Sequence, residues 1–177
     1  MYNNGLYPYP YYMRTPVYNP YGYPYWANPP MYHPDYWRKA IQLKDYGPDP
    51  FVVDIREATL QNNTFRTALW TGKHLQLTLM SINVGQDIGL EIHPDFDQFL
   101  RVEQGQGLVM MGDSKDRLDY QQHVYENCAI IIPAGKWHNV INTGCIPLKL
   151  YSIYAPPAHP HGTVHKTKQD AEEHHGY

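Results

Sequence analysis

Between residues 65 and 154 the chain consists of short segments in which apolar and polar residues alternate or apolar residues run together. Stretches rich in glycine, proline, asparagine and aspartate separate these segments. A period of two is typical of β-strands, and many short strands at this spacing indicate a sandwich or a closed barrel. We therefore expect an all-β, antiparallel barrel with strands at 66–71, 74–82, 88–93, 98–103, 108–111, 119–125, 129–132, 138–142 and 148–154.

Helical patterns are confined to the flanks of this strand region. Asp54 is followed three residues later by Glu57, a capping-box pattern that predicts a short helix over 55–61. One or two helical turns are expected over 37–44, and another in the polar segment 166–175. The turn-rich segment 45–50 marks the expected boundary. The predicted domains are an arm and linker at 1–50, a barrel at 51–157 and a polar tail at 158–177.

Residues 1–36 differ in composition from everything after them. They hold 11 of the 17 tyrosines and 8 of the 16 prolines, and only Arg14 and Asp35 carry charge. Proline removes backbone donors and disfavours helix in the residue before it, so no regular element is expected here. Two interpretations are open: a disordered or extended polyproline-like arm, or an adhesive arm whose aromatic rings bind partners. The composition resembles that of Tyr-rich arms in bacterial spore-coat proteins.

Two blocks of the strand region carry side chains that bind metals. Glu91 and His93 alternate onto one face of the strand expected at 88–93, while Ile88 and Leu90 are expected on the other face. A third candidate follows a short turn, and a fourth comes about 40 residues later. We therefore predict a metal site inside the barrel, formed by Glu91, His93, Gln98 and His138.

The two blocks resemble the paired motifs of the cupin family, whose small antiparallel barrels hold a divalent metal in their mouth. The second motif, P-x-G-x-x-H-x-x-x-N, is matched at every fixed position from Pro133 to Asn142. A glycine that the family places six residues before this proline is Asn127 here. The resemblance implies a jelly-roll barrel, also called a double-stranded β-helix, and extends over about residues 55–173.

The first cupin motif, G-x5-H-x-H-x3,4-E-x6-G, is matched only in part. Gly85, His93 and Gly105 stand at its fixed positions, whereas Glu91 replaces the first histidine and Gln98 replaces the glutamate. The net ligand charge therefore equals that of the usual three-histidine, one-glutamate site. The resemblance includes small bacterial cupins that are called mannose-6-phosphate isomerase-like, a description of fold more than of activity.

The mixed nitrogen and oxygen donor set suits manganese, iron, cobalt, nickel or zinc, with one or two coordination positions left open. No thiolate lies near the predicted cluster, which argues against a structural zinc site. The alternative is a barrel that has lost its metal and keeps His93 and His138 as hydrogen-bonded core residues. Glu91, if it is not a ligand, and Tyr154 at the mouth are the candidate catalytic residues.

Three functions remain open. The first is a metal-dependent enzyme of the isomerase, lyase or dioxygenase type, with a small sugar or organic acid as substrate. The second is a non-catalytic module that binds a sugar or another small ligand. The third is a structural spore-coat protein, in which residues 1–36 contact other coat proteins. The cupin resemblance also implies a homodimer or a higher homo-oligomer.

Composition and charge argue against two classes of partner, nucleic acids and membranes. A net charge of −3 and a pI near 6.3 give no reason to expect binding to nucleic acid or to a membrane surface. No apolar run spans a membrane and no signal peptide is recognisable, so we expect a cytoplasmic protein, with the spore coat as an alternative. Further expectations concern single residues: buried reduced thiols at Cys128 and Cys145, solvated charges at Arg101 and Lys149, and surface-loop or lid histidines at 159, 161 and 165.

Overall fold

A computed structural model describes residues 17–18, 24–25 and 40–174, in two compact units that divide after Ala40. In the first unit, β1 (Val17–Tyr18) pairs antiparallel with β2 (Pro24–Tyr25). This short ladder contradicts the expectation that the arm forms no sheet. Proline is tolerated here because Pro24 is the first residue of a strand in a two-stranded ribbon. The rest of the expected arm lies outside the described residues.

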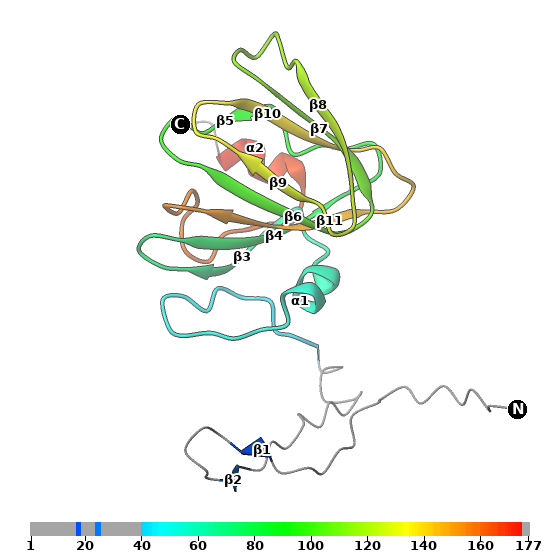
Figure 1. Ribbon diagram of the computed structural model, residues 1–177. Coiled ribbons are helices and arrows are strands. Elements are labelled where there is room, and N and C mark those ends of the chain that lie inside the picture. The colour runs from blue at the N-terminus through cyan, green and yellow to red at the C-terminus, as the bar shows by residue number, and fades with distance from the viewer. Residues whose placement is uncertain (1–16, 19–23, 26–39, 175–177) are drawn as a thin grey trace, which may run out of the picture. The chain divides into compact units, whose positions relative to one another are not determined.

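The second unit contains two antiparallel sheets that pack face to face, as Figure 1 shows. One sheet has the order β5-β10-β7-β8, and the other has the order β12-β3-β4-β11-β6-β9. All nine strands expected from the sequence are present, and the all-β cupin-like architecture is confirmed. The elements are α1 (Ile55–Gln61), β3 (Arg66–Thr71), β4 (Gln76–Ile82), β5 (Glu91–Ile92), β6 (Gln98–Gln104), β7 (Gln106–Gly112), β8 (Tyr120–Tyr125), β9 (Ala129–Ile132), β10 (Trp137–Asn142), β11 (Leu148–Tyr154), β12 (Val164–His165) and α2 (Lys168–His174).

The inner face of the six-stranded sheet is apolar at one end of its strands and polar at the other. Cross-strand partners lie on the same face of a sheet, so the register defines rows of inward side chains. At one end Ile82 lies opposite Leu148, and the next row joins Met80 and Leu150, all in the main apolar core. Toward the other end the rows become polar, with Thr78 opposite Ser152 and Gln76 opposite Tyr154; Gln98 lies opposite Tyr154 on its other side.

The outer face of this sheet is covered by residues 41–61. Leu69 and Leu79 form a second apolar cluster with Ile41, Leu43 and Phe51. Exposed and partly buried residues alternate along 40–44, and the described part of 37–44 contains no helix, so the helical turns expected there are absent from it. The compact unit begins at Ile41, ten residues before the expected start of the barrel, because this segment packs apolar side chains against the sheet.

Helix α1 begins as the capping pattern predicts. The Asp54 side chain accepts a hydrogen bond from the backbone N–H of Glu57. At the other end, the buried Nζ of Lys149 donates to the carbonyl oxygen of Leu60 at 2.5 Å and to Asn63 Oδ1 at 2.9 Å. Lys149 is therefore not the solvated charge expected from the sequence, since it satisfies carbonyl groups at the end of a helix.

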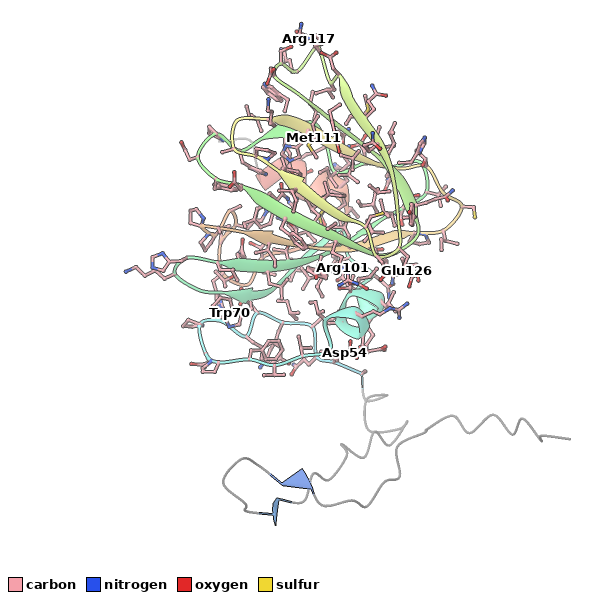
Figure 2. All side chains as sticks on the ribbon, in the orientation of Figure 1. Asp54, Trp70, Arg101, Met111, Arg117 and Glu126 are labelled. Atoms are coloured by element: carbon pink, nitrogen blue, oxygen red, sulfur yellow. The ribbon has the colours of Figure 1, made fainter. Side chains whose placement is uncertain are left out.

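A charged surface group joins α1 to the barrel. Figure 2 shows Arg101 and Glu126 beside the helix, where Arg56 contacts Glu126 at 2.7 Å. Arg101 is partly exposed, as expected, and its Nε lies 3.3 Å from the buried carboxylate of Glu103. No helix in the described part of the chain is long and apolar enough to cross a membrane.

The segment after Tyr154 is more ordered than the expected loop and tail. β12 pairs with β3, and Ala171 of α2 packs into the main core. Lys168 of α2 contacts Asp87 at 2.5 Å, in the loop that leads toward β5. Of the two cysteines, which form no disulfide, Cys128 is partly buried and Cys145 is exposed, so the expected burial of both thiols is wrong for Cys145.

Candidate metal centre

Strands β5 and β10 place the first two candidate ligands opposite each other. Glu91 and His138 are cross-strand partners, and His138 Nε2 lies 3.3 Å from Glu91 Oε1. His93 follows β5, and its Nε2 lies 3.5 Å from the same oxygen. The three ligand atoms lie within 4.8 Å of one another. The structure therefore brings Glu91 and His93 together with His138.

Backbone contacts fix both histidines. The backbone N–H of Gly135, in the turn before β10, donates to the carbonyl oxygen of His93 at 2.8 Å. His138 Nδ1 lies 2.9 Å from the carbonyl oxygen of Lys136, which can only accept, so Nδ1 carries the proton. In the neutral imidazole the lone pair is then on Nε2, the atom that faces Glu91, and a lone pair there is what a metal ligand requires.

Gln98 is buried on the inner face of β6, with Leu100 and Val102 below it in the core, as expected. Its Nε2 donates to Ser152 Oγ at 2.9 Å. The amide is thereby oriented with its oxygen free, and Oε1 has no hydrogen-bond partner among the described residues. Neighbouring Asp97 is exposed and accepts from the backbone N–H of Ala134, so it is not part of the centre.

Four buried side-chain atoms have no hydrogen bond of normal geometry in the described part of the chain: Glu91 Oε1, His93 Nε2, Gln98 Oε1 and His138 Nε2. Buried polar atoms in native proteins are almost always satisfied. A cation bound between these atoms would satisfy all four of them. The donor set therefore fits a divalent transition metal, and it does not select among the five metals expected from the sequence.

The electrostatic environment keeps Glu91 ionised. Burial alone would raise the pKa of its carboxyl group, but contacts with His138 and His93 and the nearby charge of Arg66 outweigh burial and lower the pKa well below its usual range. An ionised carboxylate is the form that binds a metal. Glu91 also approaches both imidazoles, which places it as a ligand more readily than as a free base.

Tyr154, the other candidate catalytic residue, is fully buried beside the centre. Its ring packs edge-on against His93, with centroids 5.8 Å apart, and against His159 at 5.2 Å. Burial raises the pKa of its hydroxyl group, so Tyr154 is a neutral phenol. His159 and His165 are buried, in contrast to the surface positions expected for them, while His161 is exposed and contacts the Gly47 carbonyl oxygen.

The expected strand over 88–93 is shorter than predicted. Gly89 has a φ of 95°, a left-handed conformation that interrupts the alternation. Ile88 consequently lies in the core while Leu90 is exposed, so the expectation that they share a face is wrong. Asn127, which stands where the family has glycine, has a φ of 73°. Asparagine tolerates this conformation better than other side chains, which explains the replacement.

Sequence reasoning missed one buried group near the centre, Arg66 on β3. An arginine in a predicted strand is normally read as a surface charge, and only its inward partners reveal that it is buried.

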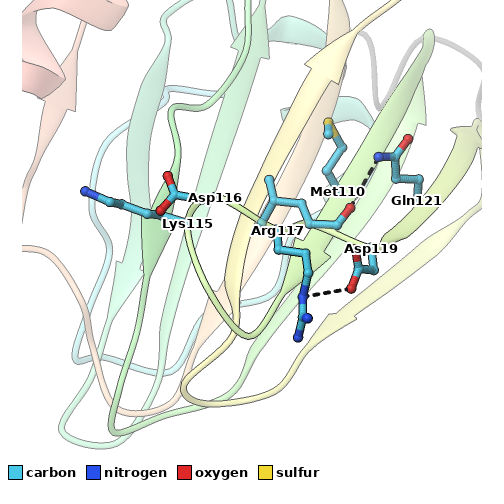
Figure 3. Close-up of a pocket in the computed structure, with 7 residues that line it drawn as sticks. Met110, Lys115, Asp116, Arg117, Asp119 and Gln121 are labelled. Carbon is cyan, nitrogen blue, oxygen red and sulfur yellow. Dashed lines mark hydrogen bonds and ion pairs between the residues drawn. The ribbon is translucent and has the colours of Figure 1, made fainter.

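A surface hollow of about 540 Å³ lies at the β7–β8 hairpin (Figure 3). It contains the exposed ion pair of Arg117 with Asp119, at 3.1 Å, and none of the candidate ligands.

Comparisons with known proteins agree with this architecture. The family model described as "Cupin domain" matches residues 78–154. The protein YrkC of Bacillus subtilis (strain 168) is 60% identical over 170 residues, which covers 91% of each chain. The protein L612 of Acanthamoeba polyphaga mimivirus is 45% identical over 116 residues, covering 64% of this chain and 70% of the relative.

Two solved structures are also similar. A crystal structure from Bacillus halodurans has 66% sequence identity and a TM-score of 0.73, and it covers 73% of this chain and 98% of its own. A protein with a double-stranded β-helix domain from Klebsiella pneumoniae shares the fold at 18% identity, with a TM-score of 0.52, 66% of this chain and 98% of its own. Since the match to YrkC leaves only about 9% of this chain uncovered, it includes part of residues 1–36.

Proposed function

The chain belongs to the cupin family, and on that premise we propose that it binds a divalent transition metal which presents open coordination positions to a small organic substrate. Glu91, His93, Gln98 and His138 are the proposed ligands. The observation that carries the proposal is the convergence of three ligand atoms within 4.8 Å, each without a hydrogen bond in the described part of the chain. Manganese, iron, cobalt, nickel and zinc all suit this donor set.

The proposed chemistry assigns different tasks to the residues of the barrel. A bound metal would act as a Lewis acid that polarises a carbonyl or hydroxyl oxygen of the substrate. Glu91 would supply the one negative charge among the ligands. Ser152 would orient the Gln98 amide, and the Lys136 carbonyl would hold His138 in the tautomer that binds. Tyr154, as a neutral phenol beside His93, would donate a hydrogen bond to substrate.

This proposal is tested by metal analysis and by the two unusual ligands. Protein purified without added metal or chelator is expected to contain a transition metal. In calorimetric titrations, Glu91→Gln should weaken binding by at least about tenfold, since it removes the only ligand charge, whereas Gln98→Glu should tighten binding because it adds an anionic oxygen. Gln122→Glu, an exposed position on β8, is the control for added charge and should leave the affinity unchanged.

Equal metal affinity in wild type, Glu91→Gln and Gln98→Glu would contradict the proposal, because neither residue would then touch the metal. Absence of binding in the wild type for all five metals would contradict it outright. His93 and His138 would in that case be structural residues of a barrel without a metal.

A further inference from the structure

We propose that Arg66 and the metal centre together form a binding site for a small carboxylate anion, so that the substrate of the barrel is an organic acid. This inference rests on the metal-binding function proposed above and specifies the substrate of the same site. Besides the candidate ligand atoms, the barrel contains buried hydrogen-bond donors that have no partner in the described part of the chain.

Arg66 points into the barrel. It is the first residue of β3 and pairs with Met80 on one side and with His165 on the other, and all three are buried. Only 2% of Arg66 is exposed. The register thus places a guanidinium group on the inner face of the six-stranded sheet, which also carries Gln98 and Tyr154.

The buried charge has no direct counter-ion in the described part of the chain. Arg66 Nε and Nη1 have no hydrogen-bond partner there, and no ion pair within 4.0 Å involves this residue. A guanidinium cannot lose its proton in a protein, and burying it unpaired is costly. An anion bound beside Arg66 would remove the cost of burying this charge without a counter-ion.

The net charge of the metal-bound centre also favours an anionic ligand. With a divalent metal bound, the interior would hold two positive charges from the metal, one from Arg66 and one negative charge from Glu91. The neutral imidazoles and the Gln98 amide add nothing, so the net charge is about +2. An anionic ligand neutralises such an interior, whereas a neutral sugar does not.

Two further polar groups lie on the inner face of the same sheet. They are the buried hydroxyl groups of Thr78 and Tyr154. Thr78 lies opposite Ser152, one inward row from Tyr154. The oxygens of a carboxylate accept hydrogen bonds, and Arg66 Nε and Nη1 are buried donors without a partner in the described part of the chain. Arginine pairs strongly with this planar group.

The test measures anion binding to the full-length protein with and without Co²⁺. Glycolate is titrated against glycolamide, its neutral counterpart, and against inorganic phosphate, with calorimetry and the visible spectrum of Co²⁺ as readouts. We expect glycolate to bind best, to change the Co²⁺ spectrum, and to bind at least about tenfold more weakly to Arg66→Gln. Arg101→Gln, a partly exposed arginine on β6, is the matched control and should behave as wild type.

Several outcomes would overturn the inference. Glycolamide that binds as tightly as glycolate would show that charge is not recognised, and phosphate that binds as tightly would refute the carboxylate assignment. Equal glycolate affinity in wild type and Arg66→Gln would refute the role of Arg66. If Arg66→Gln fails to fold, Arg66→Lys and the wild-type comparison of glycolate with glycolamide still decide the question.

The metal-free arm separates this inference from the metal-binding proposal. Glycolate, but not glycolamide, should raise the unfolding temperature of metal-free wild type through Arg66 alone. If the wild type does not bind Co²⁺ but glycolate still raises its unfolding temperature, only the metal proposal is refuted. Normal Co²⁺ binding without any preference for glycolate would refute the carboxylate site only.

Discussion

Inside the barrel, one hydrogen bond orients the His138 ring and another orients the Gln98 amide. The proton on His138 Nδ1 is directed to the Lys136 carbonyl oxygen, and the amide nitrogen of Gln98 is directed to Ser152. Each contact leaves the other end of the side chain as an acceptor that faces inward. A residue that lies outside the centre, such as Ser152, can therefore alter metal binding without contacting the metal.

Backbone conformation at one residue can be tested directly at Asn127. Its φ of 73° is costly for a residue with a Cβ, and its Oδ1 accepts from Arg101 Nη2 at 3.0 Å. We expect Asn127→Ala to lower the free energy of unfolding by about 1 kcal/mol more than Asn127→Gly. Both variants lose the contact with Arg101, so their difference in urea denaturation isolates the backbone. Equal stability of the two variants would show that the conformation imposes no cost.

At the scale of elements, the outer segment 41–53 is fastened to the barrel through Asp45. This carboxylate is 1% exposed, and it accepts from Thr71 Oγ1 at 2.6 Å and from the backbone N–H of Gly162 at 2.9 Å. One side chain therefore joins three parts of the chain: the outer segment, the end of β3 and the loop before β12. Burial would raise the pKa of Asp45, but these hydrogen bonds outweigh it and lower the pKa.

Asp45→Asn should therefore reduce stability in a pH-dependent way. The folded pKa lies below that of an ordinary aspartate, so the stabilisation is present above about pH 4 and is lost as the pH falls through the folded pKa. We expect a loss of about 1–3 kcal/mol near pH 7 and convergence with wild type in acid. His161, at 3.4 Å, is replaced by alanine in both proteins so that only the carboxyl group titrates. A constant difference across urea denaturations from about pH 7 to about pH 2 would contradict this assignment.

The elements differ in how far the sequence predicts them. Asp54 and the alternating strands are local signals, and α1 and the nine main strands are all present, although β5 is much shorter than its signal indicated. β12 has only two residues, and its pairing with β3 is long-range, so no local pattern indicates it. The expected ligands were identified from spacing and alternation, but the inward position of Arg66 depends on strand pairing that the sequence does not display.

At the scale of the whole molecule, residues 41–177 form a compact unit of their own. The compact unit starts at Ile41, and its core clusters draw on residues from Ile41 to Ala171. Removal of residues 1–39 should therefore leave metal affinity unchanged and shift the unfolding temperature by no more than about 2 °C. Calorimetry and thermal unfolding measure both quantities.

Removal of residues 164–177 is the contrasting truncation. It deletes β12, Ala171 from the core and the contact of Lys168 with Asp87, so the unfolding temperature should fall by more than about 4 °C. A stronger effect from the first truncation than from the second would contradict this assignment of the barrel unit. Whether residues 1–36 mediate assembly with other coat proteins stays a prediction, for which loss of large species in sedimentation on the first truncation is the measurement.

The change of character along the inner face of the six-stranded sheet affects how the protein can evolve. Apolar rows such as Met80 with Leu150 maintain the fold, while Thr78, Ser152 and Gln98 sit in the polar rows beside the centre. Substitutions that change ligand preference and substitutions that unfold the barrel therefore fall largely on different residues. A combinatorial library confined to the polar rows would explore new substrates within a population of folded proteins, so this barrel is a favourable starting point for directed evolution.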